Sequence, residues 1–158
     1  MTHRELMTRA IELAKQAASE GEVPVGAVIA RNGEIIAEGR NMRENGKNAL
    51  SHAEIIAIDN ACKALHSWRL EDCTLYVTLE PCPMCTGAII NSRIRRLVFG
   101  ASDYKAGSCG SVVNLFDLPY NHKPEVLSGF MQEECSAILT DFFANLRKIK
   151  SQKQTTGK

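Results

Sequence analysis

The stretch CTLYVTLEPCPMCTGAIINSRIRRLVF, residues 73–99, decides the fold. It opens with an apolar, β-rich run over 73–79, continues with helical spacing over 82–92 and closes with a second apolar run over 95–99. Two short apolar runs on either side of a helix are typical of a β-α-β unit, in which the strands are parallel and the helix crosses over between them. The stretch therefore predicts two parallel strands of one sheet and the helix that joins them.

The chain before this unit predicts an antiparallel start to the same sheet. Residues 25–30 and 34–38 are strand-like runs separated by Asn32-Gly33, which is a strong signal for a tight hairpin. An amphipathic pattern over 2–20 precedes them and predicts an opening helix. A second helical pattern follows Ser51, and its largely apolar periphery predicts burial on more than one side. The sheet is therefore expected to be mixed.

The chain after this unit predicts an irregular segment and a final helix. Residues 100–120 are rich in Gly and Ser without a sustained period, and so long a segment in a compact domain is usually functional or mobile. We expect it to form a wall of a substrate site. A short strand near 125–127 and a helix over 132–150 complete a single domain of residues 1–150, and the polar tail 151–158 is expected to be disordered.

Length and composition indicate one ordinary globular domain. A chain of 158 residues can bury a substantial core, and a formal net charge of +1 gives no global signal for nucleic acid or membrane. The first residues lack the apolar core of a secretory signal, and no apolar run approaches the roughly 18 residues of a membrane span. We therefore expect a cytoplasmic protein without membrane contact. In a reducing compartment, cysteines outside a metal site are expected to pack as small hydrophobic residues, here Cys62, Cys73, Cys109 and Cys135.

Two motifs carry the chemistry, HAE at residues 52–54 and PCPMC at residues 81–85. One imidazole and two thiolates make three protein ligands, and a tetrahedral zinc ion with three protein ligands keeps its fourth position for water, as in catalytic sites. Cys82 and Cys85 stand at i and i+3 of an expected helix start, where the helix dipole favours their thiolates. Glu54 is close enough to act as a proton shuttle. One zinc ion per chain is expected, with the ligands His52, Cys82 and Cys85.

Each motif alone has another interpretation. Ser51 and Glu54 before an apolar run also spell a capping box, in which the two side chains satisfy free amides of a helix start. A C-x-x-C pair alone is also typical of a redox site, and a zinc site can belong to a noncatalytic RNA-binding module. A purely structural site, however, would be expected to close with a fourth protein ligand. The joint pattern favours catalytic zinc, and capping and catalysis are compatible at Ser51.

The combined pattern resembles the zinc-dependent cytidine and adenosine deaminase superfamily. Within it, the likeness to the bacterial tRNA-specific adenosine deaminases runs from the first helix to about Lys150. The stretches that carry this likeness are Glu22-Val23-Pro24-Val25-Gly26-Ala27, Asn41, Leu75-Tyr76-Val77-Thr78-Leu79-Glu80-Pro81-Cys82, Phe99-Gly100-Ala101, Asp103, Lys105, Gly110-Ser111 and Asn121-His122.

The resemblance implies a three-layer α/β/α fold of the cytidine-deaminase type, with a mixed five-stranded sheet flanked by helices. It also implies hydrolytic deamination of adenosine to inosine at the wobble position of a tRNA anticodon, by a homodimer. Zinc would present hydroxide to C6 of the base while Glu54 acts as acid and base. The substrate-binding residues that it implies are Asn41, Ala53, Asp103, Lys105, Asn121 and His122. Loop turn chemistry is the alternative role for Asn41 and Asp103.

Local positive charge is available for an anticodon stem-loop. Arg43, Arg147 and Lys148 are candidates for contacts with the RNA backbone, and no acidic residue follows Asp141. A charge run on a final helix can also be a solvated face.

Two departures from the family pattern leave the substrate open. Leu50-Ser51 precedes His52 where the tRNA enzymes usually have Thr-Ala. Pro83, between the two cysteines, makes this motif resemble that of the free guanine deaminases as well. Neither departure removes a chemical group. A deaminase of free nucleobases or nucleosides, of the guanine or cytosine type, is therefore the alternative activity.

Overall fold

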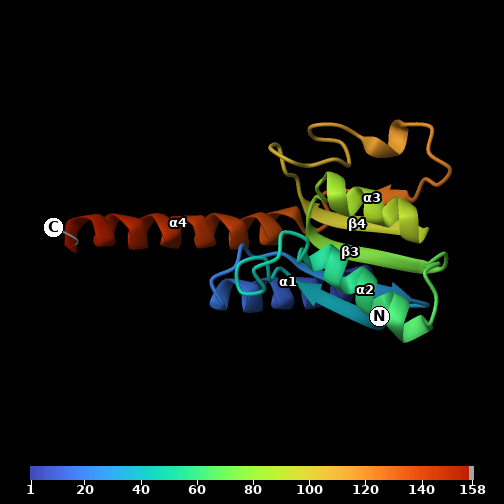
Figure 1. Cartoon of the computed structure of the whole chain (residues 1–158), viewed down its shortest axis with the longest axis horizontal. Coiled ribbons are helices and arrows are strands. Elements are labelled where there is room, and N and C mark those ends of the chain that lie inside the picture. Colours follow the sequence, from blue (N-terminus) through green and yellow to red (C-terminus); the bar gives the residue numbers. More distant parts are fainter. Residues whose placement is uncertain (157–158) are drawn as a thin grey trace.

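The computed structural model describes residues 1–156 and contains a mixed five-stranded sheet between two layers of helices (Figure 1). The elements are, in chain order, α1 (His3–Ser19), β1 (Gly26–Arg31), β2 (Glu34–Arg40), α2 (Ala53–Leu65), β3 (Cys73–Leu79), α3 (Pro83–Ser92), β4 (Arg96–Ala101), the 3-10 turn η1 (Leu115–Asp117), β5 (Glu125–Leu127) and α4 (Gln132–Thr156). The strand order is β2-β1-β3-β4-β5, with β1 antiparallel to both neighbours and β3, β4 and β5 parallel. The expected three-layer architecture is confirmed.

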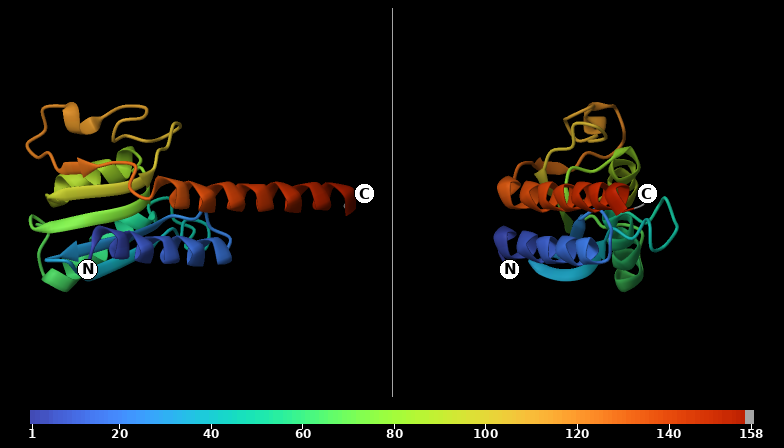
Figure 2. Two further views of the ribbon diagram at one scale, coloured as in Figure 1. Left: turned by 180° about the vertical axis from the view of Figure 1, so that it is seen from behind. Right: turned by 90° about the vertical axis from the view of Figure 1, so that its left-hand side faces the viewer.

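The two faces of the sheet carry separate hydrophobic cores. Successive residues of a strand point to opposite faces, so Leu75 of β3 lies in the core beneath α2 and α3, while Tyr76 lies in the core beneath α1 and α4. Figure 2 shows α1 and α4 on one side of the sheet and α2 and α3 on the other. Each helix layer therefore buries one face of the sheet.

The β1–β2 hairpin turns at Asn32-Gly33, as the sequence predicts. Both turn residues have positive φ, 54° and 76°, the conformation that a type I′ turn requires and that Asn and Gly tolerate best. The turn pairs Arg31 with Glu34. The turn therefore sets the register next to it, and a register shift between Ile29 and Ala30 changes the pairing over the rest of the hairpin.

Two glycines let helices approach this hairpin closely. A Cβ on Gly26 of β1 would overlap the Ala10 carbonyl oxygen and lie 2.7 Å from the Ala14 amide nitrogen, both in α1. A Cβ on Gly39 of β2 would overlap the Ala53 carbonyl oxygen in the first turn of α2. These glycines thus set how closely α1 and α2 sit on the sheet, and Gly39 positions the amino end of α2.

Replacing Gly26 by alanine is expected to lower the free energy of unfolding by about 1–3 kcal/mol, the usual cost of overpacking a close contact. Gly87 in α3 is the matched control, because a Cβ there meets no atom within 4 Å. Gly87→Ala should raise the free energy of unfolding by up to about 1 kcal/mol, since Ala favours helix over Gly. Urea denaturation measures both changes, and a Gly26→Ala variant as stable as the parent would contradict this packing.

Two elements differ from the sequence-based expectations. α2 buries the face that carries the small residues Ala53, Ala57 and Ala61, and its isoleucines are partly exposed. Burial on more than one side is therefore wrong for the single chain, because no other element within residues 1–156 covers the outer side of α2. α4 continues past Lys150, so the tail expected to be disordered is helical over residues 151–156.

The longer α4 has a simple physical cause. Gln and Lys favour helix, and no Gly or Pro occurs between Gln132 and Gly157. The rest of the expected tail, residues 157–158, lies outside the described part of the chain. Figure 1 shows α4 extending beyond the body of the domain. Over residues 1–156, no helix, α4 included, combines the length and apolar character of a membrane span.

Candidate active site

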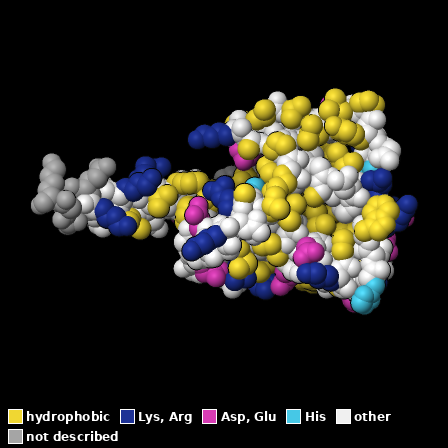
Figure 3. All heavy atoms as spheres, in the orientation of Figure 1, with side chains coloured by type: hydrophobic (Ala, Val, Ile, Leu, Met, Phe, Trp, Pro, Cys, Tyr) yellow, Lys and Arg dark blue, Asp and Glu magenta, His cyan; other side chains and the backbone are white. Residues whose placement is uncertain are grey.

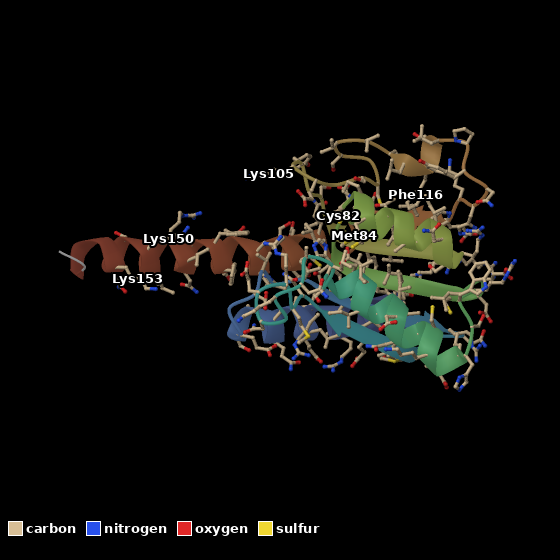
Figure 4. The ribbon with its side chains drawn as sticks, in the orientation of Figure 1. Cys82, Met84, Lys105, Phe116, Lys150 and Lys153 are labelled. Carbon is tan, nitrogen blue, oxygen red and sulfur yellow. The ribbon has the colours of Figure 1, made fainter. Side chains whose placement is uncertain are left out.

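The amino ends of α2 and α3 meet at one edge of the sheet. β2 and β3 run in the same direction on either side of β1, so the chain leaves both strands at the same edge. His52 and Cys82, which precede α2 and α3, therefore come together although they are distant in sequence. Figure 4 shows Cys82 at the base of α3, near the amino end of α2 and below the segment that carries Lys105.

His52, Cys82 and Cys85 form a cluster with the dimensions of a metal site. The Nδ1 atom of His52 lies 3.6 Å from the Sγ atom of each cysteine, and the three ligand atoms lie within 4.8 Å of one another. Zn–S bonds of about 2.3 Å and Zn–N bonds of about 2.0–2.1 Å at tetrahedral angles place N and S about 3.6 Å apart. Among the residues that the structure describes, no fourth His, Cys, Asp or Glu joins the group. The cluster could therefore hold a metal ion with an open position.

Local backbone structure leaves these side chains free for a ligand. His52 and Cys82 are the N-cap residues of α2 and α3, and neither side chain makes a capping hydrogen bond. Pro83 occupies the first turn of α3, where its missing N–H costs nothing. The capping-box interpretation of Ser51 and Glu54 is wrong, because His52 is the N-cap, so Glu54 stands at the second helical position and not at the third.

The cluster polarises its two thiols. A hydrogen bond from the Cys85 thiol, together with His52, lowers the pKa of Cys82 to about 4. The same hydrogen bond and burial raise the pKa of Cys85, and Cys82 raises the pKa of His52. The protons held between these groups are those that a divalent metal would displace, since its ligands bind as thiolates and neutral imidazole.

Glu54 lies beside the cluster and is not one of its ligands. The residue is 4% exposed, and burial raises the pKa of its carboxyl to about 7. The effect of burial outweighs that of the Cys85 thiol, which lowers this pKa. A group whose pKa lies near neutral pH both takes and gives protons readily. The arrangement can therefore carry acid and base catalysis next to an open metal position.

A pocket of about 210 Å³ opens onto this cluster. It is lined by the residues Val23, Val25, Asn41, Arg43, His52, Ala53, Glu54, Leu79, Glu80, Cys82, Asp103 and Ala106. A larger groove of about 680 Å³ runs along α1, β2 and α2, but no residue of the cluster lines it. The chemistry of the lining, not the volume, locates the candidate active site.

Sequence comparison with known proteins shows which family the chain belongs to. The family model described as MafB19-like deaminase matches residues 1–147. A protein of Bacillus subtilis named tRNA-specific adenosine deaminase is 54% identical over 152 residues, which cover 95% of this chain and 94% of the relative. The chain belongs to the tRNA-specific adenosine deaminase family.

Solved structures agree with membership of the tRNA-specific adenosine deaminases. One, from a study of A-to-I editing by tRNA:A34 deaminases at the wobble position, matches with a TM-score of 0.85 and 43% identity, covering 87% of this chain and all of the other. A guanine deaminase from Nitrosomonas europaea matches with a TM-score of 0.74 and 25% identity, covering 90% and 85% of the two chains. This chain is therefore closer to the tRNA deaminase than to this guanine deaminase.

Three substrate residues expected from the family resemblance, Asn41, Ala53 and Asp103, line the pocket. Asn41 also shapes its own loop, because its Oδ1 accepts a hydrogen bond from the amide two residues further on, at 3.2 Å. The Asp103 Oδ1 similarly accepts from the amides two and three residues further on, at 3.0 and 3.2 Å. Turn chemistry and a position at the pocket therefore coexist in both residues.

Lys105, Asn121 and His122 do not line the pocket. Lys105 is exposed on the segment above it (Figure 4). The Nε2 atom of His122 lies 2.7 Å from the carbonyl oxygen of Ile94, next to the start of β4. Because β4 and β5 are parallel, the chain returns to the amino edge of the sheet before β5, away from the pocket. Asn121 and His122 therefore lie away from this pocket within one chain, and their role in substrate binding stays a prediction.

The candidate RNA-contacting residues fall on two surfaces. Arg43 lines the pocket, whereas Arg147 and Lys148 are exposed on α4. Figure 4 shows Lys150 and Lys153 further along α4, and Figure 3 shows basic side chains along this helix. The later part of α4, from Arg147 to Lys153, is thus basic, and α4 extends beyond the body of the domain (Figure 1).

Sequence reasoning missed the less distinctive pocket residues. Val23, Val25, Leu79 and Ala106 are apolar, and in sequence they look like core or loop residues. Glu80 offered one signal, because a carboxylate stands at the end of an apolar strand, and ligands gather outside the carboxyl ends of strands in open α/β sheets.

Proposed function

We propose that this chain hydrolytically deaminates adenosine to inosine at the wobble position of a tRNA anticodon, with one zinc ion per chain. The observation that carries the proposal is the three-ligand cluster with Glu54 beside it, in a chain 54% identical to a relative named tRNA-specific adenosine deaminase. A purely structural zinc site would be closed by a fourth protein ligand, and none of the described residues supplies one.

The proposed reaction depends on proton movements through Glu54. A zinc ion bound by His52, Cys82 and Cys85 would supply the Lewis acidity that makes water nucleophilic near neutral pH. The Glu54 carboxylate takes a proton from the attacking water and delivers it to the ring nitrogen next to C6. It then assists proton transfer to the departing amino group. Adenosine and water thus yield inosine and ammonia, and Glu54 ends in its starting state.

The pocket supports an unstacked base as the substrate. It presents the apolar side chains of Val23, Val25 and Leu79. Asn41 and Asp103 add polar groups to its lining, and Arg43 adds a positive charge that suits a flanking phosphate. An enzyme reaches C6 of adenine only when the nucleotide leaves its stack, and the bases of an RNA loop splay out more readily than paired bases.

A homodimer in the cytoplasm is part of the same proposal. Hydrophobic side chains gather on the face that carries α2, α3 and the segment before β5 (Figure 3). Exposed members of that segment are Val112, Val113, Leu118 and Tyr120. Exposed apolar surface of this kind is typical of an interface between proteins. All six cysteines are free thiols, which suits a reducing compartment.

Binding of RNA by α4 gives a separate prediction. Changing Arg147 and Lys148 together to alanine is expected to weaken binding of an anticodon stem-loop and to flatten its salt dependence. The slope of log K against log salt concentration should fall by about 0.7 for each phosphate that the variant no longer neutralises. The control is the double change Lys63→Ala and Arg69→Ala, which removes the same charge from exposed, ion-paired residues. Equal slopes for the parent and the α4 variant would make α4 a solvated face.

The position of deamination tests the proposed function. The purified protein is incubated with an anticodon stem-loop that carries adenosine at the wobble position, and inosine is located by mass spectrometry of nuclease fragments. We expect inosine at that position and none when the adenosine is moved elsewhere in the loop. Inosine at every unpaired adenosine, or at none, would contradict the wobble assignment.

A further inference from the structure

Two buried carboxylates lie near the pocket but take no part in the chemistry described above. Glu22 and Glu80 are 1% and 2% exposed. A carboxylate is rarely buried so completely unless its oxygens are well bound. Within residues 1–156 neither forms an ion pair. Both instead accept hydrogen bonds from backbone amides of irregular segments.

Glu80 binds the segment that follows β4. Its Oε1 accepts from the Asp103 amide at 3.1 Å, and its Oε2 accepts from the amides of Cys109 and Ser111, each at 3.1 Å. The Ser111 hydroxyl donates a further hydrogen bond to Oε1. One side chain thus ties both ends of the segment 103–111 to the end of β3, and that segment forms one wall of the pocket.

Glu22 binds the segment that follows β2. Its Oε1 accepts from the Glu44 amide at 3.0 Å. Its Oε2 accepts from the amide and the side-chain amide of Asn45, both at 2.7 Å. The segment 41–45 brings Asn41 to the pocket and forms a second wall. The two walls are therefore held in the same way, each by one buried carboxylate.

We propose that Glu22 and Glu80 are positioning residues that hold these two walls in the arrangement that binds the substrate. Because this role concerns substrate binding, it rests on the proposed function. An irregular segment that is not tied to the core samples several conformations, and apparent affinity falls with the fraction of time spent in the competent one. All the partners described here are donors, so each site requires a group that only accepts, which a carboxylate is and an amide is not.

Glutamine at either position tests this role with little change of size. One carboxylate oxygen becomes an NH₂ group that faces N–H donors, so the wall must move. Glu80→Gln is expected to raise KM for the anticodon stem-loop about tenfold, while kcat at saturation stays within about threefold of the parent. Glu54 and the zinc ligands keep their places, so zinc content should be unchanged. Glu22→Gln is expected to behave in the same way.

Hydrogen exchange separates the two walls without any substrate. Glu80→Gln should accelerate amide exchange over 103–111 and leave 41–45 unchanged, whereas Glu22→Gln should do the reverse. Each variant is therefore the control for the other.

Two further variants sharpen the test. A Cβ on Gly107 would overlap the Glu80 carboxylate, so Gly107→Ala should reproduce the effects of Glu80→Gln. Glu71 is an exposed carboxylate paired with Arg69, and Glu71→Gln should change neither wall. If Glu80→Gln does not fold, Ser111→Ala replaces it in the exchange and KM measurements. This variant removes one hydrogen-bond donor to Glu80 and leaves the carboxylate in place.

The outcomes are distinct. Unchanged exchange and unchanged KM in both glutamine variants would overturn the positioning role. Loss of zinc with a fall in kcat and no change in KM would overturn it as well, because the carboxylates would then serve the metal site. Wall-specific exchange in a protein whose parent is inactive on RNA would support the holding of the walls and contradict the proposed function alone.

Discussion

Replacing Glu54 by glutamine is expected to slow deamination by about 10²- to 10⁴-fold while zinc remains bound. The amide keeps the size of the side chain but cannot take a proton from the attacking water. The ligand cluster should survive, because it consists of His52, Cys82 and Cys85 alone among the described residues. Loss of turnover without loss of metal would therefore identify Glu54 as the acid and base.

The measurements are the single-turnover rate of inosine formation and the zinc content by atomic spectroscopy. Asp59→Asn is the matched control, since Asp59 lies on the same helix, is exposed and pairs with Lys63. It should retain parental activity and metal. Turnover of Glu54→Gln within about tenfold of the parent would assign Glu54 a structural role.

Removal of the metal is expected to abolish deamination completely. The purified protein should contain about one zinc ion per chain, and a chelator that strips it should stop turnover until zinc is restored. Because a metal that binds only the folded state stabilises it by mass action, the zinc-free protein should also unfold at lower temperature.

The same prediction applies to the ligands. Cys82→Ser replaces a thiolate by a hydroxyl that stays protonated at neutral pH, so zinc content should fall well below that of the parent. Cys62→Ser is the control, because Cys62 is a free thiol of α2 outside the cluster. Zinc-free protein that still deaminates would refute the metal-dependent mechanism.

The fold was predictable wherever local and tertiary signals agree. The expected strand at 73–79 coincides with β3, because a short apolar run bounded by polar residues fits a buried sheet and little else. The expected strand at 125–127 coincides with β5, whose three residues are all exposed. The hairpin at Asn32-Gly33 was predictable because few residues tolerate positive φ.

The errors arise where one sequence pattern is compatible with two structures. Whether Ser51 or His52 caps α2 depends on a single backbone angle, and a capping box needs the first choice. The apolar outer side of α2 predicts burial but does not say what covers it. The polar stretch 151–156 can be tail or helix, and helix propensity decides.

The candidate site divides in the same way. The candidate metal cluster was predictable because zinc restricts both residue type and spacing, and the structure brings His52, Cys82 and Cys85 together. The apolar residues that line the pocket walls were not predictable, since they resemble any core residue. Glu80 shows the limit, because a carboxylate after a strand does not reveal that it binds a segment more than twenty residues away.

The central claim is that this pocket deaminates adenosine within RNA and not the free base. The direct measurement is a side-by-side assay of an adenosine-containing anticodon stem-loop against free adenine, adenosine, guanine and cytosine, with inosine and ammonia as readouts. We expect ammonia release and inosine from the stem-loop alone. Activity on the free compounds, with none on the stem-loop, would contradict the account and assign the chain to the nucleobase or nucleoside deaminases.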